Sequence, residues 1–101
     1  MRAVGRVLRQ EYEVITATSA ANGLEKLHRH AIDIVISDFR MPGGIDGLML
    51  LATIKDLFPK IRRFLYTGTV PEHIADQIAA GTLERCIVKP AEPEEILAAI
   101  I

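Results

Sequence analysis

The chain has 101 residues, of which half are hydrophobic and a quarter are charged. This composition favours one folded domain, because two separate cores in so short a chain would bury too little apolar surface to offset chain entropy. Twelve basic and thirteen acidic residues give a formal charge of -1, which offers no cationic surface to a nucleic acid or an anionic membrane. We therefore expect a single domain over residues 1–101 that binds neither directly.

The N-terminal segment and the single cysteine indicate a cytoplasmic protein. Arg2, Arg6 and Arg9 interrupt the first residues, so no apolar signal-peptide core is present. No apolar run approaches the roughly 18 residues that a membrane-spanning helix needs. Cys86 has no partner for an internal disulfide and no neighbouring pattern of zinc ligands, which fits a reducing compartment.

Apolar spacing predicts three elements before residue 31. Residues 1–8 carry hydrophobic side chains at helical spacing, and residues 12–18 form a β-branched run typical of a strand. Ser19 offers a capping hydroxyl for a helix over residues 20–30. The side chains expected to point inward from that helix are Leu24, Leu27 and Ala31.

The middle of the chain predicts a buried strand, a loop and a helix. Residues 32–36 are nearly all apolar, which is typical of a parallel strand covered on both faces, and this run ends at Ser37 and Asp38. One proline and three glycines mark residues 39–47 as a loop. A helix then runs to Pro59, with Leu48, Leu51, Ile54, Leu57 and Phe58 as its expected inner side chains.

The last part of the chain predicts two strands and two helices. Residues 63–66 form a strand that ends at Thr67, and Pro71 begins a short helix whose inner edge is Ile74 and Ile78. Residues 85–88 form the last strand, and Pro93 begins a terminal helix with Ile96, Leu97, Ile100 and Ile101 inward. Because strands and helices alternate strictly, the expected fold is α/β, with a doubly wound parallel sheet.

Polar side chains suited to phosphate chemistry end three successive strands: Asp38, Thr67 and Lys89. Ligands of such sheets bind at the carboxyl ends of the strands. A carboxylate can form an acyl phosphate, while a hydroxyl and an ammonium can stabilise phosphoryl oxygens. Each residue alone has an ordinary interpretation as a turn former, a strand end or a solvated charge, so the combination carries the prediction.

Four short motifs together resemble the receiver domain of bacterial two-component response regulators. They are Asp38-Phe39-Arg40-Met41-Pro42-Gly43, Asp46-Gly47, Thr67-Gly68 and Lys89-Pro90, and the resemblance extends from residue 12 to the C-terminus. The resemblance implies that Asp38 is the phosphoacceptor, Thr67 the switch hydroxyl and Lys89 the phosphate-binding cation. It also implies a cis peptide before Pro90, and Mg²⁺ bound by Asp38 and the backbone carbonyl of Arg40.

The function implied by the resemblance is phosphorelay signal transduction. A sensor histidine kinase would phosphorylate Asp38, and the resulting phosphoprotein would switch a surface that an unidentified output protein or domain reads. The chain would not be an enzyme beyond catalysing phosphotransfer to Asp38 and the hydrolysis of that phosphoryl group.

The sequence departs from the family at its beginning. Receivers of this flavodoxin-like fold have a first, central strand that ends in an acidic pair, and this pair helps to hold Mg²⁺. Residues 1–10 resemble the helix that follows that strand, so the strand and the acidic pair are absent from the chain. We therefore expect weak Mg²⁺ binding or none, and impaired phosphotransfer.

An absent central strand leaves backbone groups that something must satisfy. Three outcomes are open: the strand at residues 12–18 pairs directly with the strand ending at Asp38, a second copy of the chain donates structure as a homodimer, or the gene product is longer. We favour a rearranged or dimeric assembly. Cys86, expected as a small buried hydrophobe, replaces the aromatic residue that the family often has there, and an extra glycine lengthens the loop at Gly43-Gly44.

Two other functions remain open from sequence. The chain could be a degenerate receiver that acts as a phosphorylation-independent interaction or dimerisation module, which the absent acidic pair favours. A small hydrolase that uses Asp38 as nucleophile is the weakest hypothesis, because no convincing general base is present. His28, His30 and His73 fall on predicted helices, where solvated histidines are ordinary.

Overall fold

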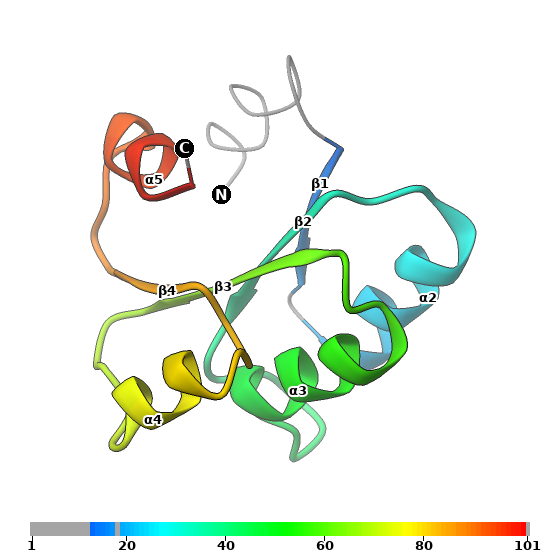
Figure 1. The fold of residues 1–101 in the computed structure, drawn as a ribbon, viewed down its shortest axis with the longest axis horizontal. Helices are drawn as coiled ribbons and strands as arrows, with labels where there is room; N and C mark the ends of the chain where they lie inside the picture. The colour runs from blue at the N-terminus through cyan, green and yellow to red at the C-terminus, as the bar shows by residue number, and fades with distance from the viewer. Residues whose placement is uncertain (1–12, 18, 101) are drawn as a thin grey trace.

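The computed structural model describes residues 13–17 and 19–100, which form an α/β fold around one sheet (Figure 1). The strands are β1 (Val14–Ala17), β2 (Ile34–Asp38), β3 (Arg62–Thr67) and β4 (Arg85–Val88), all parallel and in the order β1-β2-β3-β4. The helices are α2 (Ala20–Arg29), α3 (Gly47–Leu57), α4 (Ile74–Ala79) and α5 (Pro93–Ile100). The predicted α/β class is confirmed, and the helix expected over residues 1–8 lies outside the described residues.

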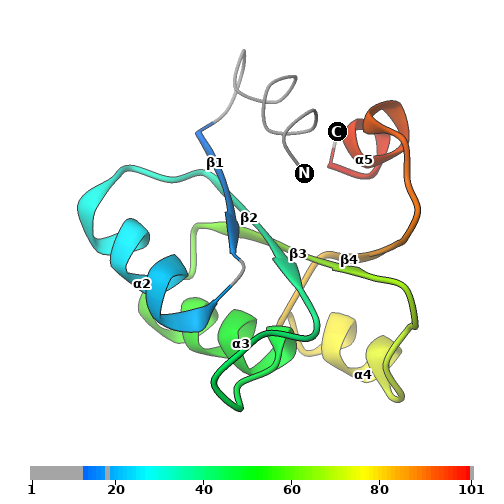
Figure 2. The same cartoon turned by 180° about the vertical axis from the view of Figure 1, so that it is seen from behind.

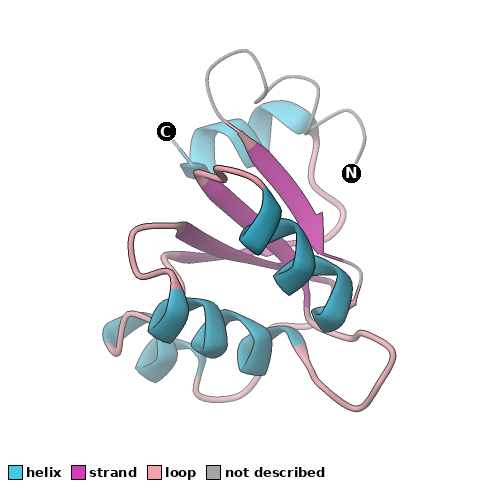
Figure 3. Cartoon of the chain, turned by 90° about the vertical axis from the view of Figure 1, so that its right-hand side faces the viewer, coloured by secondary structure: helices cyan, strands magenta, loops and turns pink. Residues whose placement is uncertain are grey.

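Helices cover both faces of the sheet. Figures 1 and 2 show α2, α3 and α4 on one side and α5 on the other, and Figure 3 shows the strands between these layers. Alternate side chains of β2 accordingly enter two cores. Val35 belongs to the core beneath α2 and α3, while Ile34 and Ile36 belong to the core that includes Ile96 of α5. No helix in the described ranges is long and apolar enough to cross a membrane.

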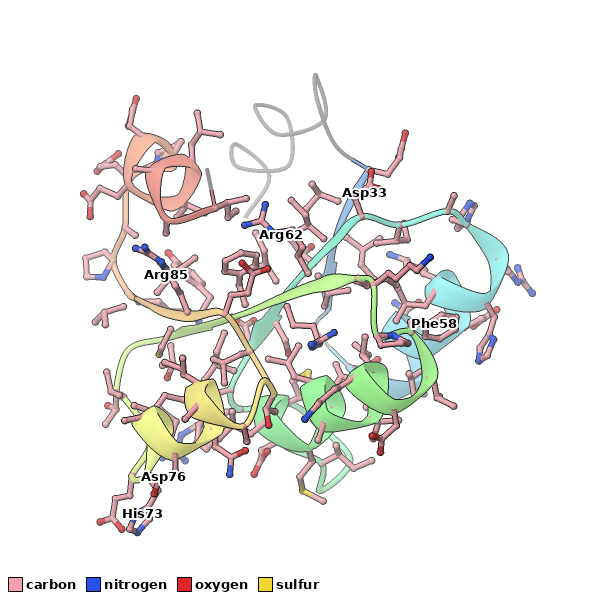
Figure 4. All side chains as sticks on the ribbon, in the orientation of Figure 1. Asp33, Phe58, Arg62, His73, Asp76 and Arg85 are labelled. Carbon is pink, nitrogen blue, oxygen red and sulfur yellow. The ribbon has the colours of Figure 1, made fainter. Side chains whose placement is uncertain are left out.

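Strand β1 pairs directly with β2. Their register aligns Val14 with Ile34, and the backbone N–H of Asp33 donates to the Glu13 carbonyl at 2.9 Å. The Asp33 carboxylate in turn accepts from the Glu13 N–H at 3.0 Å, and it lies at the start of this seam in Figure 4. This pairing is the first of the three outcomes considered from the sequence, because β1 and β2 satisfy each other's backbone groups without a strand between them.

The predicted N-cap of α2 is confirmed, whereas several side chains that were predicted to point toward the core are exposed. Ser19 caps α2 by accepting from the Asn22 N–H, as predicted. Three residues predicted to point inward are exposed, and those assignments were wrong: they are Ala31, Leu57 and Ile78. Ala31 lies beyond the end of α2, and Leu57 lies in the last turn of α3, where the apolar stripe has rotated away from the sheet.

Helix α4 is shorter than predicted. It begins at Ile74 rather than Pro71, because His73 adopts a left-handed conformation (φ 59°) that a helix cannot continue through. None of its side chains is fully buried, although Ile74 packs against the core beneath α3. Helix α4 is therefore held to the sheet by few apolar contacts, and its outer face remains open to solvent.

Arg62 fastens the end of α5 to the sheet. Its Nη2 donates to the Ile100 carbonyl at 2.6 Å, its Nε pairs with Glu84 at 2.8 Å, and its guanidinium lies 5.3 Å from the centre of the Phe64 ring. Figure 4 shows Arg62 in the space between the sheet and α5. The charge of this arginine thus satisfies a helix C-terminus, which carries a partial negative charge.

Arg63, the next residue of β3, ties the opposite side of the strand to the loop before β4. Its guanidinium donates to the carbonyls of Thr82, Pro59, Ile61 and Gly81 at 2.7 to 3.3 Å. Burial lowers the pKa of Arg63, and the nearby Glu84 carboxylate partly offsets this effect. The group stays charged, since an arginine pKa lies far above neutrality.

Replacing Arg63 should therefore weaken the fold. We expect Arg63→Met to lower the free energy of unfolding by about 2–4 kcal/mol, because a charged donor is lost and several carbonyls lose their partner. Arg63→Lys should lose less, since an ammonium reaches some of the same oxygens but not all. Urea unfolding followed by circular dichroism measures both.

The matched control is Arg29→Met. Arg29 pairs with Glu25 at 3.0 Å on the surface of α2, with its side chain 71% exposed. A pair of this kind should contribute at most about 0.5 kcal/mol. Equal losses for Arg29→Met and Arg63→Met would contradict the role assigned to Arg63.

Candidate functional site

An ion pair joins two of the predicted site residues at the carboxyl edge of the sheet. The Lys89 ammonium lies 2.9 Å from Oδ1 of Asp38, and both side chains are partly open to solvent, at 41% and 30% exposure. Asp38 ends β2, and Lys89 follows the last residue of β4. The structure therefore brings together a carboxylate and a cation from the ends of two different strands.

The strand register explains why these two groups meet. Asp38 aligns with Tyr66 of β3, and Tyr66 aligns with Ile87 of β4. Side chains of aligned residues in parallel strands point to the same face of the sheet. Lys89 comes two residues after Ile87, and because side chains alternate along a strand, it shares this orientation. The backbone N–H of Lys89 continues the ladder by donating to the Thr67 carbonyl at 2.8 Å, which extends this alternation past the end of β4.

Tyr66 is a site residue that sequence reasoning missed. The Lys89 ammonium lies 5.0 Å from the centre of the Tyr66 ring, within the range of a cation–π interaction. Tyr66 was assigned only as part of a strand. The parallel register of β2 and β3 could have identified it, since it places Tyr66 directly beside Asp38.

Thr67 lines the same cleft but does not contact Asp38. Its hydroxyl donates to the Thr69 carbonyl at 2.9 Å and accepts from the Thr69 N–H at 3.3 Å. The cleft has a volume of about 410 Å³, and its wall includes Asp38, Thr67 and Lys89. All three predicted groups thus share one cleft, with the hydroxyl bonded to its own loop.

The side chains at this edge do not fit a magnesium ion. In residues 13–17 and 19–100, no group of three or more His, Cys, Asp or Glu side chains lies together as a metal site would require. Asp38 and Glu72 are the carboxylates of the cleft wall, and Asp38 is already paired with an ammonium. Because Mg²⁺ requires near-octahedral oxygen ligation, the predicted ligands Asp38 and the Arg40 carbonyl are too few by themselves.

The Asp38 carbonyl is in close contact with the residues around it. Ser37, whose side chain is buried, donates through its hydroxyl to the Asp38 carbonyl at 2.9 Å. Gly47 donates to the Phe39 carbonyl at 2.6 Å, and a methyl group at Gly47 would collide with the Asp38 carbonyl. Asp46 caps α3 by accepting from the Met49 N–H at 2.9 Å. The start of α3 therefore fits against Asp38 only because residue 47 has no side chain.

The other residues singled out from the sequence are the Lys89–Pro90 peptide, Cys86 and the three histidines. The peptide bond between Lys89 and Pro90 is cis, the conformation that the resemblance implies. Cys86 is partly buried against the core beneath α3, and burial raises the pKa of its thiol. His28, His30 and His73 are all exposed. Figure 4 shows His73 and Asp76 at the outer tip of α4.

Comparison with known proteins identifies relatives over nearly the whole chain. A model of the response regulator receiver domain family matches residues 1–101. The transcriptional regulatory protein GlrR of Escherichia coli K12 is 39% identical over 72 residues, which are 69% of this chain and 16% of GlrR. The chain thus spans about a sixth of that relative's length.

Two solved structures share both fold and sequence similarity. The signal receiver domain of an HD domain-containing protein from Pseudomonas fluorescens Pf-5 superposes with a TM-score of 0.78 and 32% identity, covering 98% of this chain and 74% of that one. A response regulator from Burkholderia pseudomallei gives a TM-score of 0.78 and 29% identity, covering 99% and 59%. That protein was solved with a phosphorylated aspartic acid, a calcium ion and citrate.

A methyl group at Gly47 should disturb the site. We expect Gly47→Ala to lower the free energy of unfolding by about 2 kcal/mol, because the Asp38 carbonyl must move although alanine itself favours helix. Gly68→Ala, where an added methyl meets no atom within 4 Å, should change stability by less than about 0.5 kcal/mol. Urea unfolding of both variants tests this, and equal stability of the two would contradict the close approach.

Proposed function

Because the chain belongs to the response regulator receiver domain family, we propose that Asp38 accepts a phosphoryl group from the phosphohistidine of a sensor histidine kinase. The observation that carries this proposal is the Asp38–Lys89 ion pair at 2.9 Å, in a cleft whose wall also includes Thr67. The Burkholderia pseudomallei relative, whose aspartic acid is phosphorylated, supports the same chemistry.

The proposed step moves one phosphoryl group between two side chains. A carboxylate oxygen of Asp38 attacks phosphorus, the N–P bond of the phosphohistidine breaks, and its electron pair stays on the imidazole nitrogen. Lys89 stabilises charge on the phosphoryl oxygens, since its ammonium already lies at the nucleophile. The Thr67 hydroxyl becomes a second donor once it leaves the Thr69 carbonyl, which a side-chain rotation allows.

The output of phosphorylation is a changed protein surface. Helix α4 has no fully buried side chain, and three hydrophobic residues of α4, of the loop before it and of β4 are exposed, at 38 to 48%: Ile78, Val70 and Val88. New charge at Asp38 would bias the arrangement of α4, β4 and α5, and an output protein or domain would read that arrangement. We expect this exchange to occur in the bacterial cytoplasm, where the chain has no turnover activity beyond its own phosphorylation and dephosphorylation.

A second candidate function is an interaction or dimerisation module that never carries phosphate. The poor fit of the cleft to Mg²⁺ favours it, because losing metal stabilisation of the phosphoryl charge would slow phosphotransfer on the order of 10³-fold or more. This candidate predicts concentration-dependent association in light scattering with no chemistry at Asp38.

The phosphoacceptor proposal has a direct test by mass spectrometry. We expect the 101-residue chain to keep its mass in acetyl phosphate and Mg²⁺, because Asp38 alone is a weak magnesium site. A chain extended upstream by an apolar strand that ends in two acidic residues should gain one phosphoryl group. Peptide mapping should locate that group on Asp38.

Asp38→Asn in the extended chain is the control, since the amide removes the nucleophilic oxygen with little change in shape. Labelling of this variant at the same rate would exclude Asp38 as the acceptor. If neither chain gains mass and the protein associates with increasing concentration, the interaction module is the better function. Labelling of the 101-residue chain on Asp38 would support the acceptor and contradict the expectation that phosphorylation needs an upstream acidic pair.

A further inference from the structure

The Lys89 ammonium has two neighbours of different chemistry. On one side, Oδ1 of Asp38 lies at 2.9 Å, and on the other, the Tyr66 ring centre lies at 5.0 Å. The carboxylate holds the ammonium by charge. The ring holds it through the negative face of its π system, which needs no hydrogen bond and tolerates displacement within about 6 Å.

The Tyr66 ring is held by its contacts with the core, whereas the Lys89 side chain is long and partly exposed. Tyr66 is the penultimate residue of β3 and lies between Asp38 of β2 and Ile87 of β4 in the strand register. Its side chain is partly buried against the core that includes Ile96. The Lys89 side chain is 41% exposed. Ordering a lysine side chain costs rotamer entropy, so a single partly exposed ion pair holds it weakly.

The Asp38–Lys89 contact cannot persist unchanged through the reaction. When the Asp38 carboxylate attacks phosphorus, it becomes an ester-like oxygen and the negative charge moves outward onto the phosphoryl oxygens. The ammonium must follow that charge while remaining at the site. A ring face allows this movement, because the attraction depends weakly on lateral position.

We propose that Tyr66 is a positioning residue that keeps the Lys89 ammonium at the phosphoryl site through its ring face. The inference rests on the proposed function for its consequence, because the rate of Asp38 phosphorylation should depend on the ring. The arrangement itself, Lys89 over Tyr66, does not depend on phosphorylation and is measured separately.

The first measurement reads the arrangement by nuclear magnetic resonance. The chain has only four lysines, so lysine labelled with ¹³C gives few signals, and Lys89→Met assigns the one from Lys89. We expect the Lys89 side-chain protons to resonate upfield, since they lie over an aromatic face. Tyr66→Leu should abolish this shift and Tyr66→Phe should retain it, because phenylalanine keeps the ring and loses only the hydroxyl.

Phe39→Leu is the matched control for that measurement. Phe39 lines the same cleft, but its neighbours belong to the core on the α3 side of the sheet. Removing its ring should therefore leave the Lys89 shift unchanged. Far-ultraviolet circular dichroism and thermal unfolding verify that each variant is folded, so that loss of the shift reports the ring and not the fold.

The second measurement is the rate of Asp38 labelling in the chain that carries the upstream acidic strand. Tyr66→Leu should slow labelling about three- to tenfold relative to the unsubstituted chain, the range that corresponds to a partly exposed cation–π contact. Tyr66→Phe should be labelled at the rate of the unsubstituted chain. An unchanged Lys89 signal in Tyr66→Leu, or equal slowing by leucine and phenylalanine, would overturn the proposal. If no chain is labelled at all, the proposed function fails, while the Lys89 signal still decides the role of Tyr66.

Discussion

The parallel register of β2, β3 and β4 is the constraint on which the site depends. Because the three strands run in one direction, their last residues reach a common edge, and their alternation decides which side chain faces which layer. Asp38 and Tyr66 are aligned neighbours, and Lys89 continues the same row beyond Ile87. A shift of one residue in either strand pair would turn the carboxylate away from the ammonium.

The two groups that could stabilise a phosphoryl oxygen share one cleft but belong to different segments. Lys89 follows β4 and leads into the loop before α5, whereas Thr67 ends β3 and bonds to Thr69 in the loop before α4. A phosphoryl group at Asp38 would attract both. The charge would therefore act at once on the segment leading into α4 and on the segment leading into α5.

In the described residues, β1 and β2 pair directly with each other. The Glu13 and Asp33 backbones and the Asp33 carboxylate close the start of the seam, so the paired backbone groups of both strands are satisfied. The acidic pair that the family resemblance implies would come from a strand in this position. In the described part of the chain, Lys89 is the charged partner that Asp38 has, so the position of Asp38 depends on it.

The sequence predicted the alternation of strands and helices because the signals are local. A short apolar run marks a strand that is buried on both faces, and a cap residue such as Ser19 marks the start of a helix. It also placed Asp38, Thr67 and Lys89 at the ends of recognisable strands, and the structure brings all three to one cleft. It failed at Leu57 and Ile78, where helical spacing continues but the helix turns its apolar side chain away from the sheet. Inner faces depend on helix rotation, which is a property of packing that no local pattern contains.

Tyr66 shows the same limit at the site. Within β3 it looks like any strand aromatic, and its place at the site follows only from pairing with residues 28 positions earlier and 21 positions later, Asp38 and Ile87. Only the register makes it a neighbour of the carboxylate and of the lysine that follows β4. Tyr66 also packs against the core that includes Ile96 of α5. The same ring therefore contacts both the Lys89 ammonium and the layer beneath α5.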